Sequence, residues 1–284
     1  MSFTAFQLLN GLTFAALLFL VASGFTLIFG LMRIVNLAHG AMYLTGGYVG
    51  YAVATATHSF FLGLVAAAVL VALLGFGVQS LLRFVGGIEL RQVLLTLGLA
   101  LMLNDATLVL FGGDAFSVPV PELLRGPLEF AGLTYPRYRL FVFAVGVLVF
   151  ALLWLLMNRS RFGALIRAGV DDAETVEAMG IDIRKIFILT FMLGMALAGM
   201  AGALGGAFLS LYPTADAEIL VFSLAVVIIG GRGSLLGAAV GSLAVAMLST
   251  FGQVWFPELS YFVIFGPMAL LLAFRPLGLF GRAT

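Results

Sequence analysis

Long stretches of apolar residues alternate with short polar connections along most of the chain. Nine stretches stand out, at residues 6–31, 40–57, 60–82, 92–111, 138–157, 187–210, 217–230, 234–254 and 260–274. A transmembrane helix needs about 20 predominantly apolar residues. Helices are expected throughout, because an open strand edge leaves backbone groups without partners in lipid. The pattern predicts an all-α polytopic membrane protein, a bundle of eight to nine transmembrane helices that are glycine-rich and partly broken.

Two features leave the number of spans open between eight and nine. Only residues 231–233 separate segments 217–230 and 234–254, so the pair is either two spans or one broken or re-entrant element. Segment 40–57 is short and contains several glycines. Little sequence remains outside the apolar stretches, so residues 1–284 are expected to form a single transmembrane domain.

Composition supports this interpretation and excludes several classes of function. Hydrophobic residues make up 63% of the 284 residues and charged residues only 10%, whereas soluble domains have about 45–50% and 25%. The chain has no cysteine, which excludes disulfides and thiolate metal sites, and two histidines are too few for a histidine-rich metal site. A net charge of +1 gives no basic surface for nucleic acid.

The sequence also lacks the phosphate-binding loop of P-loop ATPases. The single lysine, Lys185, is not part of a G-x-x-x-x-G-K-[ST] phosphate-binding loop. If ATP drives transport here, we expect the ATPase to be a separate chain. No cleavable signal peptide is expected, because the first apolar stretch is long and has no basic start.

Basic residues gather in every second connection, which predicts the orientation. If the N-terminus is outside and nine segments alternate, only Arg125, Arg137 and Arg139 fall outside. Cytoplasmic loops are enriched in Lys and Arg, so we expect the N-terminus outside and the C-terminus in the cytoplasm. Eleven of the 14 basic residues then lie in the cytoplasm: Arg33, Arg83, Arg91, Arg159, Arg161, Arg167, Arg184, Lys185, Arg232, Arg275 and Arg282.

Two longer polar segments lie on opposite sides in this arrangement. Residues 112–137 contain four prolines and are expected to form an outer loop. Residues 159–187 form the large cytoplasmic loop. Asp171 and Glu174 resemble a capping box, and Gly180 stands where a helix ends, so a short helix is expected at 172–179.

That short helix has two possible roles. It is either part of a solvated loop on the membrane surface or a coupling helix that docks on a cytoplasmic ATPase. The balance of five basic and five acidic residues over 159–187 argues against anionic lipid as its partner. The candidate coupling residues are Arg161, Arg167, Asp171, Asp172, Glu174, Glu177 and Gly180.

Small residues recur at intervals of four within three of the segments. Such stripes let helix backbones approach closely in membranes, although glycines can also line a narrow pathway. The stripes are Gly46, Gly50 and Ala54; Gly194, Ala198, Gly202 and Gly206; and Gly233, Gly237 and Gly241.

Polar residues at membrane depth are candidates for a translocation path. Asn104 and Asp105 interrupt an apolar segment, and Asp105 is either an interfacial acid or one that faces substrate. Asn36, His39 and Tyr43, together with Arg33, would share one face if this region were a single helix. Gly30 and Gly40 could break that helix, and a broken helix offers backbone groups to a polar substrate.

Three of these motifs resemble those of one family. Residues 35–48 (VNLAHGAMYLTGGY) resemble the N-F-A-H-G-x-x-Y-x-x-G-A-Y element of LivH-type permeases from branched-chain amino-acid ABC importers. Residues 230–241 (GGRGSLLGAAVG) resemble the G-G-x-G-[ST]-x-x-G-x-x-x-G element of that family. Within residues 161–181, the fragments RFG, IRA and AMGI resemble its cytoplasmic loop.

The resemblance implies a transport subunit and not an enzyme. It implies a permease that moves branched-chain or related amino acids across the bacterial inner membrane by alternating access. The implied partners are two cytoplasmic ABC ATPases, a second permease of LivM type and a periplasmic substrate-binding protein. No cofactor is expected on this chain, because ATP would be bound by the partner ATPases.

Three alternatives remain open from the sequence. Urea and short-chain amide ABC importers use the same type of permease. An ion-coupled secondary transporter would use Asp105 as its proton or cation site. A membrane-embedded enzyme is the least favoured, because Asp105 is the one acid that falls clearly within a predicted span.

Overall fold

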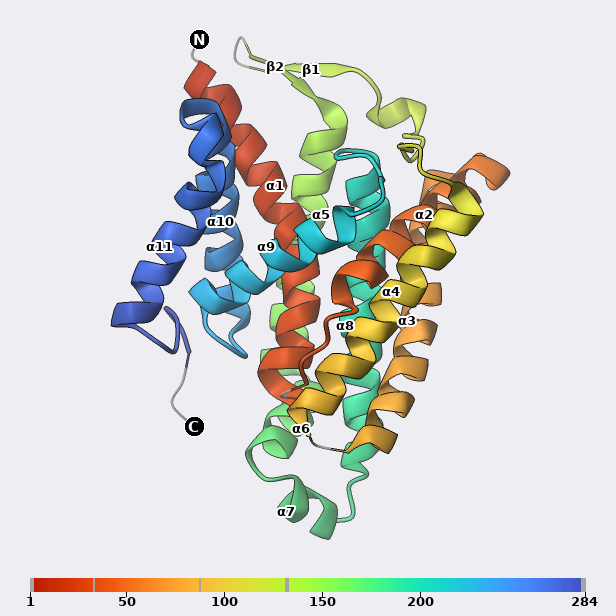
Figure 1. Ribbon diagram of the computed structural model, residues 1–284, viewed down its shortest axis with the longest axis vertical. Helices are drawn as coiled ribbons and strands as arrows, with labels where there is room; N and C mark the ends of the chain where they lie inside the picture. The colour runs from red at the N-terminus through yellow and green to blue at the C-terminus, as the bar shows by residue number, and fades with distance from the viewer. Residues whose placement is uncertain (1–2, 33, 87, 131–132, 282–284) are drawn as a thin grey trace.

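The structure is a computed structural model that describes residues 3–32, 34–86, 88–130 and 133–281, most of them helical (Figure 1). Arg33 and Arg282, which contributed to the predicted orientation, lie outside the described residues. The α-helices are α1 Phe3–Phe25, α2 His39–Thr57, α3 Phe60–Val85, α4 Glu89–Phe111, α5 Arg137–Arg159, α6 Arg161–Asp171, α7 Ala173–Ala178, α8 Ile183–Gly206, α9 Ala215–Gly230, α10 Leu235–Trp255 and α11 Ser260–Phe274. The other elements are the π-helix η1 Thr26–Leu31, the 3-10 helices η2 Glu122–Leu124 and η3 Pro257–Leu259, and strands β1 Pro127–Phe130 and β2 Leu133–Pro136.

Six helical segments among the described residues are long and apolar enough to cross a membrane: Phe3–Gly30, Phe60–Val85, Glu89–Phe111, Arg137–Arg159, Ile183–Gly206 and Leu235–Trp255. The other three apolar segments predicted from the sequence form α2, α9 and α11. The chain is therefore a polytopic, mostly helical membrane protein. The prediction of eight to nine spans is not confirmed.

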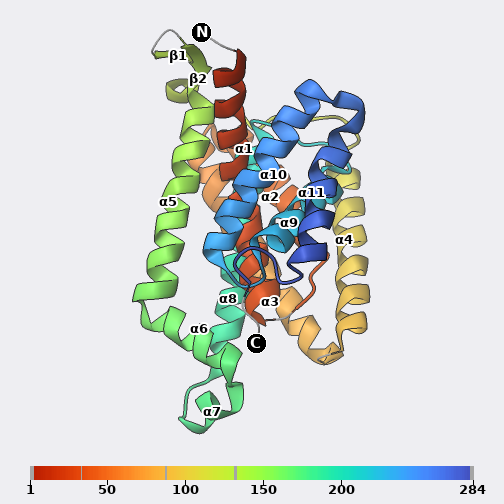
Figure 2. The ribbon, with the colours of Figure 1, turned by 90° about the vertical axis from the view of Figure 1, so that its left-hand side faces the viewer.

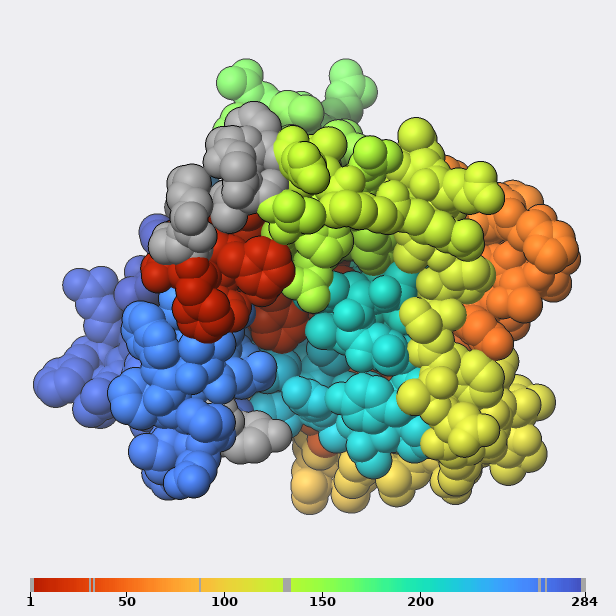
Figure 3. All heavy atoms as spheres, turned by 90° about the horizontal axis from the view of Figure 1, so that it is seen from above, coloured from red at the N-terminus to blue at the C-terminus, as the bar shows by residue number. Residues whose placement is uncertain are grey.

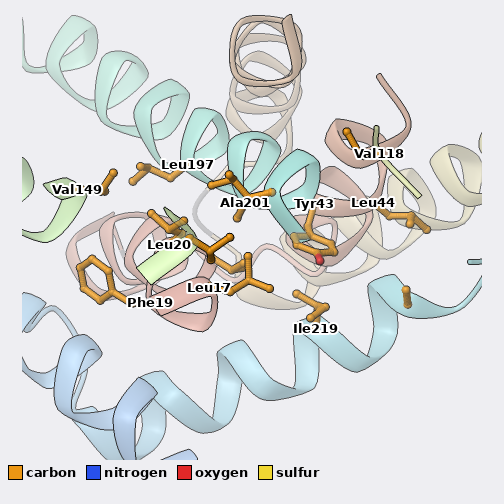
Figure 4. Packing of buried hydrophobic residues seen from close by; sticks show 14 of the residues in the cluster. Leu17, Phe19, Leu20, Tyr43, Leu44, Val118, Val149, Leu197, Ala201 and Ile219 are labelled. Atoms are coloured by element: carbon orange, nitrogen blue, oxygen red, sulfur yellow. The ribbon is translucent and has the colours of Figure 1, made fainter. Parts of the chain in front are cut away.

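Helix α8 forms the centre of the bundle and packs against α1, α2 and α3. Its small residues allow this close packing, because a Cβ atom added to Gly194 would lie 2.8 Å from the carbonyl oxygen of Gly24. A Cβ atom on Gly50 of α2 would lie 2.6 Å from that of Ala203. Around these contacts, apolar side chains from α1, α2, α8 and α9 form a continuous core (Figure 4).

The two ends of the bundle carry different structures. The β1–β2 hairpin and the start of α1 lie at the end that is uppermost in Figures 1 and 2, and α6 and α7 project from the opposite end. The predicted outer loop 112–137 thus contains an antiparallel hairpin, which pairs Pro127 with Pro136. Its proline content did not predict strands.

The chain from 217 to 254 forms two helices and a tight turn. Gly231 (φ +97°) and Gly233 (φ +75°) adopt conformations that favour glycine, and Ser234 caps α10 through the amide of Gly237. The C-terminal residues return to this break. The amides of Leu279 and Phe280 donate to the carbonyls of Ile229 and Gly230, at 2.9 and 3.0 Å.

Candidate functional site

A non-helical stretch crosses the interior of the bundle between η1 and α2. We call residues 34–38 the crossing segment. Figure 1 shows it rising from the lower end of α1 to the middle of the bundle, where α2 begins. The hydroxyl of Thr96 on α4 accepts a hydrogen bond from the Leu37 amide at 3.1 Å, and the Asn36 side chain accepts one from the Ala38 amide at 3.1 Å. Irregular backbone at membrane depth is tolerated where protein buries it in this way.

This geometry corrects one prediction and confirms another. Asn36 does not share a helical face with His39 and Tyr43, because it belongs to the crossing segment and they belong to α2. The helix is broken between Gly30 and Gly40, as the sequence indicated. Arg33, the fourth member of the predicted face, lies outside the described residues.

His39 joins the start of α2 to α1. Its side chain is fully buried, and its Nε2 lies 3.0 Å from the carbonyl oxygen of Val21. A carbonyl oxygen only accepts hydrogen bonds, so Nε2 is the protonated nitrogen here. The edge of the imidazole also meets the Phe25 ring, with centroids 5.2 Å apart.

Asn104 and Asp105 face different surroundings although they are neighbours on α4. The Asn104 amide nitrogen donates to the carboxylate of Asp216 on α9 at 2.7 Å. Asp216 is only 8% exposed, and its backbone carbonyl contacts Gly40. Asp105 lies on the exposed face of α4. Figure 2 shows α4 at the edge of the bundle.

Sequence reasoning missed Asp216. The apolar segment was placed from residue 217, so its first acid was assigned to a loop. A signal was present, because an acid at the start of an apolar helix is stabilised by the helix dipole and needs a polar partner when buried.

A cavity opens at the upper end of the bundle. We call it the upper cavity. Its volume is about 390 Å³, within the range of about 300–1,000 Å³ that is usual for small-molecule sites. Seen from above, the surface is hollowed between the start of α1, the end of α10 and the stretch before α9 (Figure 3). Tyr43, the one candidate path residue that lines this cavity, extends toward Ile219 of α9 (Figure 4).

Sequence reasoning missed the polar residues that line the upper cavity beside Tyr43. Gln7, Asn10, Arg139 and Glu218 are among them. These four lie near helix ends, where polar residues are ordinary, so no local pattern distinguishes them. Their common position depends on the packing of α1, α5 and α9, which the sequence does not reveal.

The opposite end carries the predicted coupling loop. Asp172 caps α7, because its carboxylate accepts a hydrogen bond from the Thr175 amide at 3.0 Å. The predicted cap, Asp171, is instead the last residue of α6. Gly180 (φ +81°) ends the α7 turn as expected. The hydrogen bonds from Thr175 lower the pKa of Asp172, since they stabilise its charged form.

Helix α7 leaves most of its surface free. Val176 is its one buried residue, whereas Glu174 and Glu177 are exposed and Met179, just beyond the helix, is 73% exposed. Arg161 is exposed at the start of α6, and the Arg167 guanidinium donates to the Met157 carbonyl, which fastens α6 to α5. Helix α7 thus presents a small surface with two exposed acidic residues, Glu174 and Glu177.

Comparison with known proteins identifies the family. The family described as "Branched-chain amino acid transport system / permease component" matches residues 7–272. The chain belongs to this family. It is a transport permease subunit of the ABC-importer type and not itself an enzyme.

Individual relatives of this permease cover most of its length. The high-affinity branched-chain amino acid transport system permease protein BraD of Pseudomonas aeruginosa is 32% identical, over 97% of this chain and 95% of the relative. The corresponding LivH protein of Escherichia coli is 26% identical over the same shares. A probable branched-chain amino acid transport permease protein LivM of Methanocaldococcus jannaschii is 28% identical, over 76% of this chain and 68% of the relative. No solved structure matches the chain.

Proposed function

We propose that this chain is the permease subunit of an ATP-driven importer for branched-chain or related amino acids in the bacterial inner membrane. The match to the permease family over residues 7–272 carries the proposal. The names of the BraD and LivH relatives, which each cover 97% of the chain, support the substrate class. They do not support the urea or amide permease or the ion-coupled transporter.

The partners follow from this type of importer. Two cytoplasmic ATPases would bind ATP, a periplasmic binding protein would deliver the amino acid, and a second permease of LivM type would complete the path. The similarity between this chain and a LivM protein supports a pair of related permeases. No cofactor would reside on this chain.

The orientation would place the N-terminus and the upper cavity outside and the C-terminus in the cytoplasm. Support comes from the described basic residues. Those at the end that carries α6 and α7 are Arg83, Arg91, Arg159, Arg161, Arg167, Arg184 and Lys185, whereas Arg125, Arg137 and Arg139 lie at the other end. The other two described basic residues, Arg232 and Arg275, follow α9 and α11. Cytoplasmic loops are the more basic ones.

Transport would proceed by alternating access, driven through α7. Closure of the ATPase dimer would push on α7, and α6 would transmit this motion to α5 through the contact between Arg167 and Met157. The crossing segment and α9 interrupt the bundle at mid-depth, and Asn36, His39, Tyr43 and Asn104 are the candidates for its path. Asp105, the fifth candidate from the sequence, lies on the exposed face of α4. Discontinuous helices at this depth are where many transporters bind substrate.

Isolation of the N-terminally tagged chain from its native membrane in mild detergent, with mass spectrometry, tests the partners. We expect a P-loop ATPase and a second hydrophobic permease to co-purify. Finding the chain alone would contradict the importer.

Uptake by the reconstituted complex tests the activity. We expect radiolabelled leucine to enter proteoliposomes only with ATP and a loaded binding protein, and uptake to persist when the proton gradient is collapsed. Uptake that needs the gradient and not ATP would support a secondary transporter instead.

A further inference from the structure

The upper cavity contains one basic and one acidic side chain, and these are not paired with each other. Arg139 from α5 and Glu218 from α9 both line it. Among the described residues, the sole ion pair joins Lys185 to Asp182, at the other end of the molecule. Within the part of the chain that the structure describes, neither Arg139 nor Glu218 forms an ion pair. Together they could bind a ligand that carries one negative and one positive group.

Arg139 is held in place with most of its donors free. Its guanidinium donates to the side-chain oxygen of Asn10 on α1 and lies over the Phe208 ring, 4.9 Å from the centroid. A guanidinium has five N–H donors and binds carboxylates through a planar pair of them. One bond to Asn10 therefore orients the group and leaves enough donors for a carboxylate.

Glu218 is held on the α9 side of the same cavity. Its carboxylate accepts a hydrogen bond from the Tyr212 hydroxyl at 2.7 Å. An ionised carboxylate has two oxygens and about four acceptor positions, so this bond leaves capacity for an ammonium group. Phe208 and Tyr212, which support the two charged groups, belong to one short stretch before α9.

Part of the cavity wall is apolar, whereas Ser249, Thr250 and Gln253 of α10 add polar side chains to another part. Phe14 lies one helical turn deeper along α1 than Asn10, and Phe222 lies one turn further along α9 than Glu218. Their rings meet edge to face with centroids 5.6 Å apart, and Ile219 lines the same wall. This apolar part of the wall suits an aliphatic side chain.

We propose that the upper cavity binds the zwitterionic head of an aliphatic α-amino acid, with Arg139 on its carboxylate and Glu218 on its ammonium group. This assignment rests on the proposed function and adds to it a site on the permease itself. The cavity would receive the amino acid after its release from the binding protein.

The test uses the full complex in proteoliposomes and measures two quantities: leucine uptake per ATP hydrolysed, and ATP hydrolysis stimulated by loaded binding protein. The variants are Glu218→Gln, Arg139→Gln and the charge-preserving Arg139→Lys. Arg137→Gln and Glu258→Gln are matched controls, because both residues are exposed and neither lines the cavity.

Glu218→Gln should lower leucine uptake per ATP at least tenfold, equal to about 1.4 kcal/mol, while stimulated hydrolysis persists. Arg139→Gln should behave alike, and Arg139→Lys should keep more uptake than Arg139→Gln. Since Glu218 is exposed, its variant tests the idea even if changes at Arg139 disturb assembly.

Two results would overturn the assignment while leaving the proposed function intact. One is normal uptake per ATP in Glu218→Gln. The other is an increase in the binding-protein concentration needed for half-maximal ATP hydrolysis, which would mean that these charges contact the binding protein. If the wild-type complex does not import leucine at all, the proposed function fails and this assignment fails with it.

Discussion

One side-chain hydrogen bond joins α4 to α9, between Asn104 and Asp216. Asn104→Leu would leave the buried carboxylate without this donor, and an unsatisfied buried group costs about 1–3 kcal/mol. We expect a lower midpoint of thermal unfolding in detergent and reduced uptake. Asp105→Asn is the control, since Asp105 is exposed on the next position of the same helix, and it should leave both nearly unchanged. Equal effects of the two changes would contradict the role given to Asn104.

Gly202 of α8 tests the close contacts between helices. A Cβ atom added to Gly202 would overlap the backbone carbonyl oxygen of Tyr43. A side chain at this position would therefore force α8 away from α2. Overpacking of this kind costs about 1–3 kcal/mol and occasionally more. Gly202→Leu should therefore reduce the yield of folded protein in size-exclusion chromatography.

Gly98 on α4 provides the matched control for that change. No atom lies within 4 Å of a Cβ atom added there, among the residues described. Gly98→Leu should elute like the wild type. A similar loss for both variants would mean that added bulk in any helix is harmful, whatever it touches.

The sequence indicates some of these residues but not their partners. Asn104 was visible because an amide in an apolar helix is unusual. Its bond to Asp216 joins positions 112 apart in the chain, and no local pattern specifies such a pair. The same holds for Arg139 and Glu218, which meet in one cavity only through the packing of α5 and α9.

Among the elements, α7 is the one whose position predicts a role in coupling. Glu174→Arg reverses a charge on its exposed surface, and Gly180→Leu strains the backbone turn that ends it. Both should lower leucine uptake per ATP hydrolysed without loss of membrane insertion, because docking on the ATPase would be disturbed. Asp114→Arg, an equivalent charge change at the opposite end of the bundle, should not. Normal coupling in both α7 variants would refute the docking role.

The Asp172 cap makes α7 sensitive to acid. Hydrogen bonds lower the pKa of Asp172 in the folded state, so its stabilising effect is complete above the usual carboxyl pKa. The effect is lost as the pH falls through the lowered value. Amide hydrogen exchange at Thr175 and Val176 should therefore accelerate in that acidic range. Asp172→Asn should keep the cap without this pH dependence, because asparagine caps helices as well as aspartate does.

The elements most reliably predicted from the sequence were the long apolar helices. The nine apolar stretches all became helices, because a run of this length has few other ways to satisfy its backbone in lipid. The crossing segment was not predicted in detail. Its residues are as apolar as their neighbours, and its non-helical path depends on a hydrogen bond to Thr96, 59 positions away.

For the whole molecule, the absence of cysteine from the sequence allows a direct test of orientation. Single variants Asp114→Cys and Glu174→Cys place one thiol at each end of the bundle, on exposed residues. With the N-terminus outside, a membrane-impermeant maleimide should label Asp114→Cys in intact cells without an outer membrane. Glu174→Cys should react only after permeabilisation. The reverse pattern would invert the proposed topology.

The contact between the C-terminal residues and α9 also has a consequence for biosynthesis. The carbonyls of Ile229 and Gly230 receive their donors from Leu279 and Phe280, and Gly230 and Phe280 are 50 residues apart (280 − 230). At about 5–20 residues per second, the ribosome needs roughly 2.5–10 s to make that length. The end of α9 must therefore wait for residues made 50 positions later before its hydrogen bonds are complete. A chain that stops before Leu279 would leave the carbonyls of Ile229 and Gly230 without these two donors.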